Sequence, residues 1–153
     1  MKIKIILNLS FLILLISCKT AIAQEYFVND FNINSEYNES EIISKIGAPD
    51  SKTEGGPEII QEFGYNTYMY KYGASYIDFK DEANAITSIT IKDTKLSING
   101  ITIGATKSEV KSKFENYDEL DNRLVIRFQG YAVLSFTFDA NGLLSKISYI
   151  VFT

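Results

Sequence analysis

Two short stretches of the chain carry apolar residues at the spacing of an amphipathic helix. In SEIISKIGAPD, Ile42 and Ile46 lie about one turn apart, with Ser and Lys between them. In SEVKSKFENYD, Val110 and Phe114 repeat this arrangement. The two stretches align at a separation of 68 positions (108 − 40 = 68). The pattern therefore predicts two short helices at equivalent places in the chain.

The residues before each stretch predict where its helix begins. Thr106 and Glu109 form a capping-box sequence, in which the hydroxyl and the carboxylate each accept a hydrogen bond from a free backbone N–H group. Asn38 and Glu41 are the counterpart of this pair in the first stretch. The Gly-Ala-Pro sequence after Ile46 ends the first helix, because proline cannot continue one.

Extended segments rich in aromatic and β-branched residues follow each helix and predict strands. They are NTYMYKY, SYIDFK and ITSITIK after the first helix, and RLVIRF, AVLSFTF and LLSKISYIVF after the second. The extended segments YFVNDFNI and LSINGITI precede the helices, and the polar segment DSKTEGGPE predicts a flexible loop. The predicted fold class is α+β: two tandem copies of a helix packed on an antiparallel β-meander. The copies span residues of about 26–93 and 96–153, within a single domain of residues 24–153.

Tyrosines are concentrated in and around the first two strands that follow the first helix, and their orientation depends on the turn at Gly73. A two-residue turn places Tyr72 opposite Ser75 and directs the strand's tyrosines into the core. A three-residue turn, like that expected at residues 129–131, directs them to the open face, where they would form a partner-binding surface. Both alternatives stay open. The candidate partner-binding residues are Tyr65, Tyr68, Tyr70, Tyr72 and Tyr76.

The first residues of the chain predict an export signal, residues 1–23. Lys2 and Lys4 precede an apolar run that is too short to span a bilayer as a helix. Leu-Ile-Ser-Cys ending at Cys18 has the form of a lipobox, which predicts lipidation of Cys18 and an outer-membrane or periplasmic lipoprotein. The alternative is ordinary cleavage before Gln24, which would give a soluble periplasmic or secreted protein.

The composition of the chain limits the partners and the kinds of site that we expect. With Lys2, Lys4 and Lys19 removed, 12 basic residues face 19 acidic ones, so a chain beginning at Gln24 has a formal charge of 12 − 19 = −7. That charge excludes nucleic acid as an expected partner. Residues after Cys18 include neither His nor Cys, so we expect no cofactor, no metal and no catalytic residues.

Three polar motifs bear on this expectation. Ser108 and Lys111 have Ser-x-x-Lys spacing but are predicted to lie toward the outward side of a helix. Asp139 and Asn141 supply too few carboxylates for calcium, so a hairpin turn is expected there. The acidic segment 118–122 is expected to be a solvated loop.

The segments ITIGATKSEVKSKF and FTFDANGLLSKI resemble the repeat unit shared by the SmpA/OmlA small outer-membrane lipoproteins and the beta-lactamase inhibitor protein. The resemblance covers nearly all of the chain after the signal, although the disulfides of the inhibitor are missing and residues 34–40 form a longer entry to the first helix. Family members bind other proteins. The resemblance thus implies a non-enzymatic cell-envelope module that binds another envelope or secreted protein, either as an enzyme inhibitor or as an accessory of an outer-membrane complex. The alternative function is a small carboxylate-dependent hydrolase.

Overall fold

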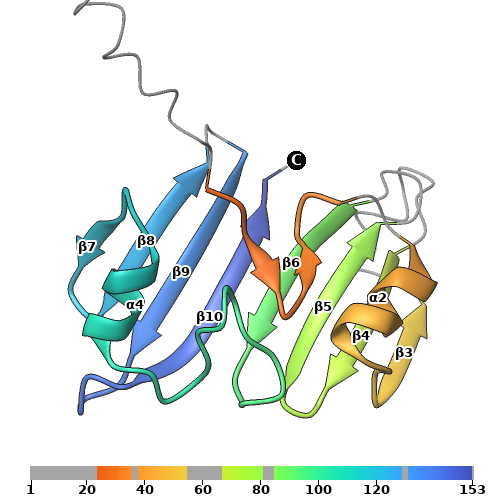
Figure 1. Cartoon of the computed structure of the whole chain (residues 1–153), viewed down its shortest axis with the longest axis horizontal. Coiled ribbons are helices and arrows are strands. Elements are labelled where there is room, and N and C mark those ends of the chain that lie inside the picture. Colours follow the sequence, from red (N-terminus) through yellow and green to blue (C-terminus); the bar gives the residue numbers. More distant parts are fainter. Residues whose placement is uncertain (1–23, 36–37, 55–66, 81–84, 129–130, 153) are drawn as a thin grey trace, which may run out of the picture.

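The computed structural model describes residues 24–35, 38–54, 67–80, 85–128 and 131–152. Its main feature is an eight-stranded antiparallel sheet in the order β3-β4-β5-β6-β10-β9-β8-β7, accompanied by a two-stranded sheet, β1-β2 (Figure 1). The elements are β1 (Phe27–Val28), β2 (Phe31–Asn32), α2 (Glu39–Ile46), β3 (Ser51–Glu54), β4 (Thr67–Tyr72), β5 (Ser75–Lys80), β6 (Ala85–Ile91), α4 (Lys107–Lys113), β7 (Asp118–Leu120), β8 (Arg123–Phe128), β9 (Ala132–Phe138) and β10 (Leu144–Val151).

Both helices and the small sheet lie on the same face of the large sheet (Figure 1). We call this the helix face; it carries the buried side chains of Ile77, Ile89 and Ile147. The core lies between the two layers, where Phe114, just after α4, packs 4.7 Å from Phe136 between ring centroids. The opposite face of the sheet, which we call the open face, carries Tyr76 and the residues in register with it.

The predicted helix starts are confirmed. The Asn38 side chain accepts a hydrogen bond from the backbone N–H of Glu41 at 3.1 Å. Thr106 and Glu109 form the complete capping box: the Thr106 hydroxyl accepts from the Glu109 N–H at 3.3 Å, and the Glu109 carboxylate accepts from the Thr106 N–H at 2.7 Å. The first helix ends at Gly47, whose φ of 100° leaves the helical region.

The predicted fold class is wrong. The described chain is mostly β, with only two short helices of 8 and 7 residues, and not two tandem copies of a helix packed on an antiparallel β-meander. β6 and β10 pair from Ile91↔Ile147 to Ser88↔Ile150, so the strands that follow the two helices form one continuous sheet. The physical reason is that aromatic and β-branched residues favour strands in most of the described elements. The pairing of β6 with β10 also buries edges that separate meanders would leave open.

The sequence predicts the individual strands more accurately than the fold class. The six predicted segments correspond to β4, β5, β6, β8, β9 and β10. The three-residue turn of the second half is also confirmed, because Phe128 lies opposite Ala132. Two segments expected as loops contain edge strands instead: β3 in DSKTEGGPE and β7 in the acidic segment 118–122. Each of these edge strands pairs with a predicted strand beside it. The hydrogen bonds of that pairing stabilise a strand that the local sequence does not predict.

Candidate partner-binding surface

The β4–β5 hairpin decides where the tyrosines point. Tyr72 lies opposite Ser75 and Tyr70 opposite Ile77, so Gly73 and Ala74 form a two-residue turn. Gly73 has a φ of +64°, which fits a turn that requires glycine at its first central position. The three-residue alternative, which directed the tyrosines outward, is therefore wrong: the turns of the two halves of the sheet differ in length.

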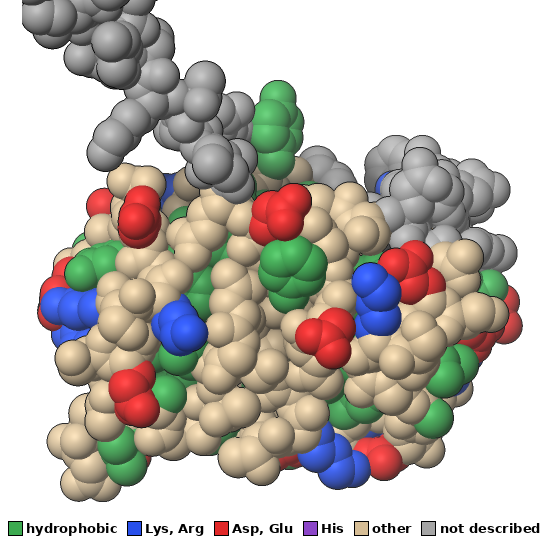
Figure 2. Space-filling view, viewed as in Figure 1, with side chains coloured by type: hydrophobic (Ala, Val, Ile, Leu, Met, Phe, Trp, Pro, Cys, Tyr) green, Lys and Arg blue, Asp and Glu red, His purple; other side chains and the backbone are tan. Residues whose placement is uncertain are grey.

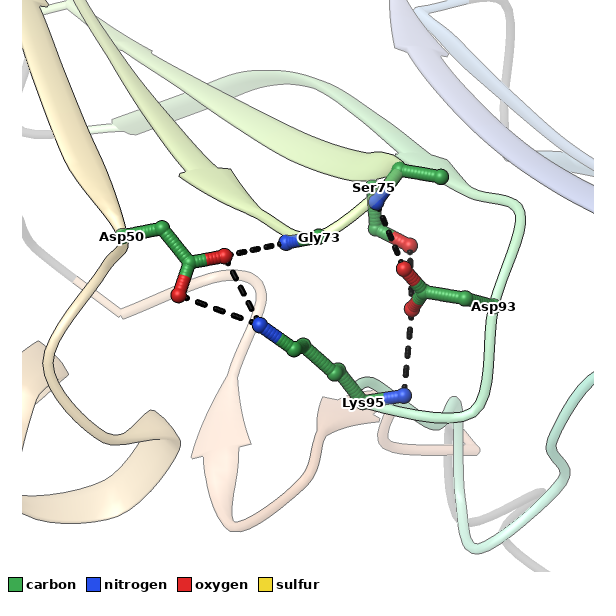
Figure 3. Close-up of polar contacts among 6 residues, drawn as sticks. Asp50, Gly73, Ser75, Asp93 and Lys95 are labelled. Carbon is green, nitrogen blue, oxygen red and sulfur yellow. Dashed lines mark hydrogen bonds and ion pairs between the residues drawn. The ribbon is translucent and has the colours of Figure 1, made fainter.

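A cluster of polar residues around this turn stabilises its two-residue form (Figure 3). We call it the turn cluster; it consists of Asp50, Gly73, Ser75, Asp93 and Lys95, with the backbone of Ala74 between them. The Asp50 carboxylate accepts from the Gly73 N–H at 2.5 Å, and the Asp93 carboxylate accepts from the Ala74 N–H at 2.6 Å. Asp93 also accepts from the Ser75 hydroxyl at 2.9 Å. Both turn N–H groups are thus bonded to carboxylates from other parts of the chain.

Charge also stabilises the turn cluster. The Lys95 ammonium donates to both oxygens of Asp50, at 3.0 and 2.8 Å. Its hydrogen bond, together with that of the Gly73 N–H, lowers the pKa of the Asp50 carboxyl. Burial works to raise the pKa of Asp93, but hydrogen bonds from Ala74, Lys95 and Ser75 outweigh it and leave that pKa below its usual value. The sequence contained no signal for this cluster beyond an aspartate on either side of the β4–β5–β6 region.

Three of the predicted binding tyrosines lie on the helix face. Tyr70 is 0% exposed and Tyr72 is 4% exposed, so neither offers contact area to a partner. The Tyr72 hydroxyl donates to the Gly47 carbonyl at 3.1 Å, and burial raises the pKa of Tyr72 to about 12. Tyr68 is half-buried, with the Lys52 ammonium 4.4 Å from its ring centroid. Tyr65 lies outside the described residues.

Tyr76 differs from these three because it lies on the open face, half-buried and opposite Thr90 of β6. Side chains in register with Tyr76 form a row across the sheet. A second row lies parallel to the first, two residues further along each strand. The first row is Lys71, Tyr76, Thr90, Ser148, Ser135 and Val125, and the second is Met69, Asp78, Ser88, Ile150, Val133 and Arg127. The open face therefore has small hydroxyl residues near its middle, apolar residues beside them and a cation toward each end.

Asp78 is an unusual carboxylate on this face. Burial raises its pKa, and a hydrogen bond from the Ser88 hydroxyl opposes that rise. The pairing of β5 with β6 shifts register just after Asp78, and the hydroxyl of Thr87 donates to the Asp78 carbonyl at 3.2 Å. The irregularity places two hydroxyl side chains around one acidic residue. Sequence reasoning missed this arrangement because it depends on the register of β5 and β6.

Lys111 and Asp139, which belong to the three polar motifs of the sequence, make local contacts. The Lys111 ammonium bonds to Glu119 of β7 at 2.6 Å, while Ser108 is exposed on α4. Asp139 accepts from the N–H groups of Asn141 and Leu143, both at 2.9 Å, as expected for a hairpin turn. Among the described residues no group of three or more acidic, His or Cys side chains is arranged to hold a metal ion.

The predicted lipidation residue, Cys18, and the rest of the export signal lie outside the described residues. Within the described part of the chain, no helix has the length and apolar character needed to cross a membrane.

Comparisons with known proteins do not assign the chain to a family. No family model matches it, and no curated protein matches it. Among solved structures, it is similar to an extracellular protein containing an SCP domain from Bacillus anthracis str. Ames, with 13% identity and a TM-score of 0.46 over 76% of this chain and 44% of that one. It is also similar to a cysteine-rich secretory protein from Staphylococcus aureus subsp. aureus Mu50, with 14% identity and a TM-score of 0.44 over 76% of this chain and 43% of that one. The chain thus spans less than half of each, and likeness at these TM-scores supports no conclusion about function.

Proposed function

We propose that the chain is a non-enzymatic, exported cell-envelope module that binds another protein through the open face of its sheet. One observation carries the proposal: two rows of side chains cross the six central strands of the sheet, on a face where no described helix or strand packs. The signal-like residues 1–23 support export, either as a lipoprotein anchored at Cys18 or as a soluble protein beginning at Gln24.

The open face has the physical properties of a recognition surface. Its strands are held by hydrogen bonds on both sides and by the core beneath them, so binding would order little backbone. Tyr76 and Met69 offer apolar contact area, and the neighbouring Ser and Thr residues leave room for a partner's side chains. Tyrosine provides such area at a small cost in conformational entropy. These features suit a protein partner better than a small molecule, which would need a concave pocket.

The open face does not favour the alternative of a carboxylate-dependent hydrolase. Such an enzyme needs two carboxylates that divide the acid and base roles. Asp78 has the raised pKa expected of the acid, but the residues in register beside it on the neighbouring strands are Met69 and Ser88, neither of which is a carboxylate. Two carboxylates whose pKa values are lowered, Asp50 and Glu119, form ion pairs with lysines.

Capture from envelope extracts tests the proposal. The parent protein is compared with a Tyr76→Ser/Met69→Ser variant of the open face and with an Ile43→Ser/Leu143→Ser control, whose side chains are exposed elsewhere. We expect the control to recover the same protein as the parent and the open-face variant to lose it. Equal recovery by both variants would show that the partner binds another surface. Hydrolysis that depends on Asp78, with no partner recovered, would favour the enzyme.

A further inference from the structure

The three most exposed large hydrophobic side chains of the described residues lie at one end of the sheet. Tyr131 is 72% exposed, Phe152 57% and Ile150 48%. The other exposed large hydrophobic residues reach no more than 40% and are scattered: Ile43 on α2, Leu120 on β7 and Leu143 in the β9–β10 turn. Scattered apolar residues are ordinary on a protein surface, whereas a group of them indicates a contact.

Backbone pairing places the exposed residues side by side. Ile150 lies opposite Val133 in the pairing of β10 with β9, and Val151 lies opposite Ala132. One step further, the Phe152 N–H donates to the Tyr131 carbonyl at 2.6 Å. Strand alternation puts the four residues in a two-by-two block at the edge of the open face. We call Tyr131, Val133, Ile150 and Phe152 the end patch.

The end patch lies where the described chain begins. The Tyr26 ring packs against Phe128 at a centroid distance of 4.8 Å, and the Phe128 carbonyl accepts a hydrogen bond from the Tyr131 N–H at 2.9 Å. Figure 1 shows the described ribbon starting beside the ends of β8 and β9, with the C-terminus beyond β10 at the same end of the sheet. In Figure 2 a hydrophobic side chain projects from this end of the molecule. Any anchor attached to the N-terminal segment is therefore tied to the end that carries the patch.

Chain length limits how far such an anchor can lie from the domain. Cys18 is six residues before Gln24 (24 − 18 = 6), and six extended residues span at most about 20 Å. The Gln24 side chain is itself attached to the domain, because it donates to the Lys113 carbonyl at 2.8 Å. A lipid on Cys18 would hold the end of the sheet close to the bilayer surface.

We propose that the end patch contacts the lipid bilayer and orients the domain with its patch end toward the membrane. The proposal rests on the lipoprotein form of the proposed function. Aromatic side chains with an apolar body and a polar tip are favoured at the headgroup level, and a protein held by a lipid anchor gains stability from a second contact. The chain is acidic, so attraction to anionic headgroups does not supply that contact. Arg127, the charged neighbour of Val133 in β8, is paired with Asp118.

Tryptophan fluorescence tests the proposal, because the chain has no Trp of its own. Tyr131→Trp places a single fluorophore in the end patch. Leu143→Trp is the matched control, since it lies in the turn at the opposite end of β9 and β10 and is also exposed. Each full-length protein, purified from membranes of an expressing cell, is reconstituted in vesicles of phosphatidylethanolamine and phosphatidylglycerol, with or without brominated acyl chains. The mass of each protein reports acylation.

In acylated protein, we expect brominated lipids to quench the Tyr131→Trp fluorescence and to leave that of Leu143→Trp unchanged. The emission of Tyr131→Trp should also shift to shorter wavelength on transfer from detergent to unbrominated vesicles. Equal quenching of both variants, or of neither, would overturn the contact while leaving partner binding through the open face intact. A mature mass that begins at Gln24 would also overturn it, because no anchor would then hold the patch at the bilayer. Partner capture does not depend on either result, so failure of the proposed function is recognised separately.

Discussion

Tyr72 lies directly opposite Ser75 across the β4–β5 hairpin, and this pairing places the tyrosines of β4 in the core. Ser75 is itself fully buried, and its hydroxyl both donates to Asp93 and accepts from the backbone N–H of Lys92, at 3.0 Å. One more residue in the turn would move Tyr70 and Tyr72 to the open face. The turn cluster therefore determines which side chains of β4 lie on the open face.

Gly73→Ala should destabilise the protein more than Gly142→Ala. Both glycines have positive φ, +64° and +77°, so alanine costs about 1–2 kcal/mol of backbone strain at either site. A Cβ at Gly73 would also collide with the Asp93 carboxylate, whereas one at Gly142 meets nothing within 4 Å. Urea denaturation of both variants measures the difference. An equal loss of stability in both variants would mean that the Asp93 carboxylate does not collide with a Cβ at position 73.

Tyr70→Ser should destabilise the protein strongly, whereas Tyr76→Ser should change its stability little. Tyr70 is fully buried, so its truncation should cost roughly 3–5 kcal/mol of unfolding free energy. Tyr76 lies on the open face and should change stability by no more than about 1 kcal/mol. Thermal melting of the two variants decides this. A stable Tyr70→Ser protein would contradict the two-residue turn.

Stability should fall in acid as Glu119 becomes protonated. Hydrogen bonds from Lys107 and Lys111 hold the pKa of Glu119 at about 2, below its ordinary value of 4.5. Because the folded-state pKa is the lower one, the stabilisation is present above pH 4.5 and is lost as pH falls toward 2. Glu119→Gln should therefore reduce the loss of stability in that range. Glu115→Gln, at an exposed position, is the control, and urea midpoints as a function of pH are the measurement.

Asp78 should lower the stability of the protein as pH rises, whereas Glu119 raises it. Burial raises its folded-state pKa above 3.8, so its contribution is most favourable below pH 3.8 and is lost as pH rises through the folded value. Asp78→Asn, which stays neutral, should be more stable than the parent at neutral pH, with the difference shrinking toward pH 3.8. Chemical denaturation across this range measures it. A constant difference at every pH would show that burial of the charge is not the cause.

Local features of the fold were predictable because they depend on neighbouring residues. The caps at Asn38 and Thr106 form as expected, since each side chain bonds a backbone group three residues away. The hairpin at Asp139 forms for the same reason. Segments rich in aromatic and β-branched residues located six strands.

By itself, the sequence determined the helix starts, most strands and the length of the turn between β8 and β9. The tertiary structure decided the register of β4 with β5, because the carboxylates that bond to the turn come from Asp50 and Asp93, about 20 residues away on either side. It also decided the pairing of β6 with β10, which joins residues as distant as Ser88 and Ile150 into one sheet. A two-residue and a three-residue turn differ little in local propensity, so contacts between distant residues select one of them, and the candidate binding surface changes with that selection.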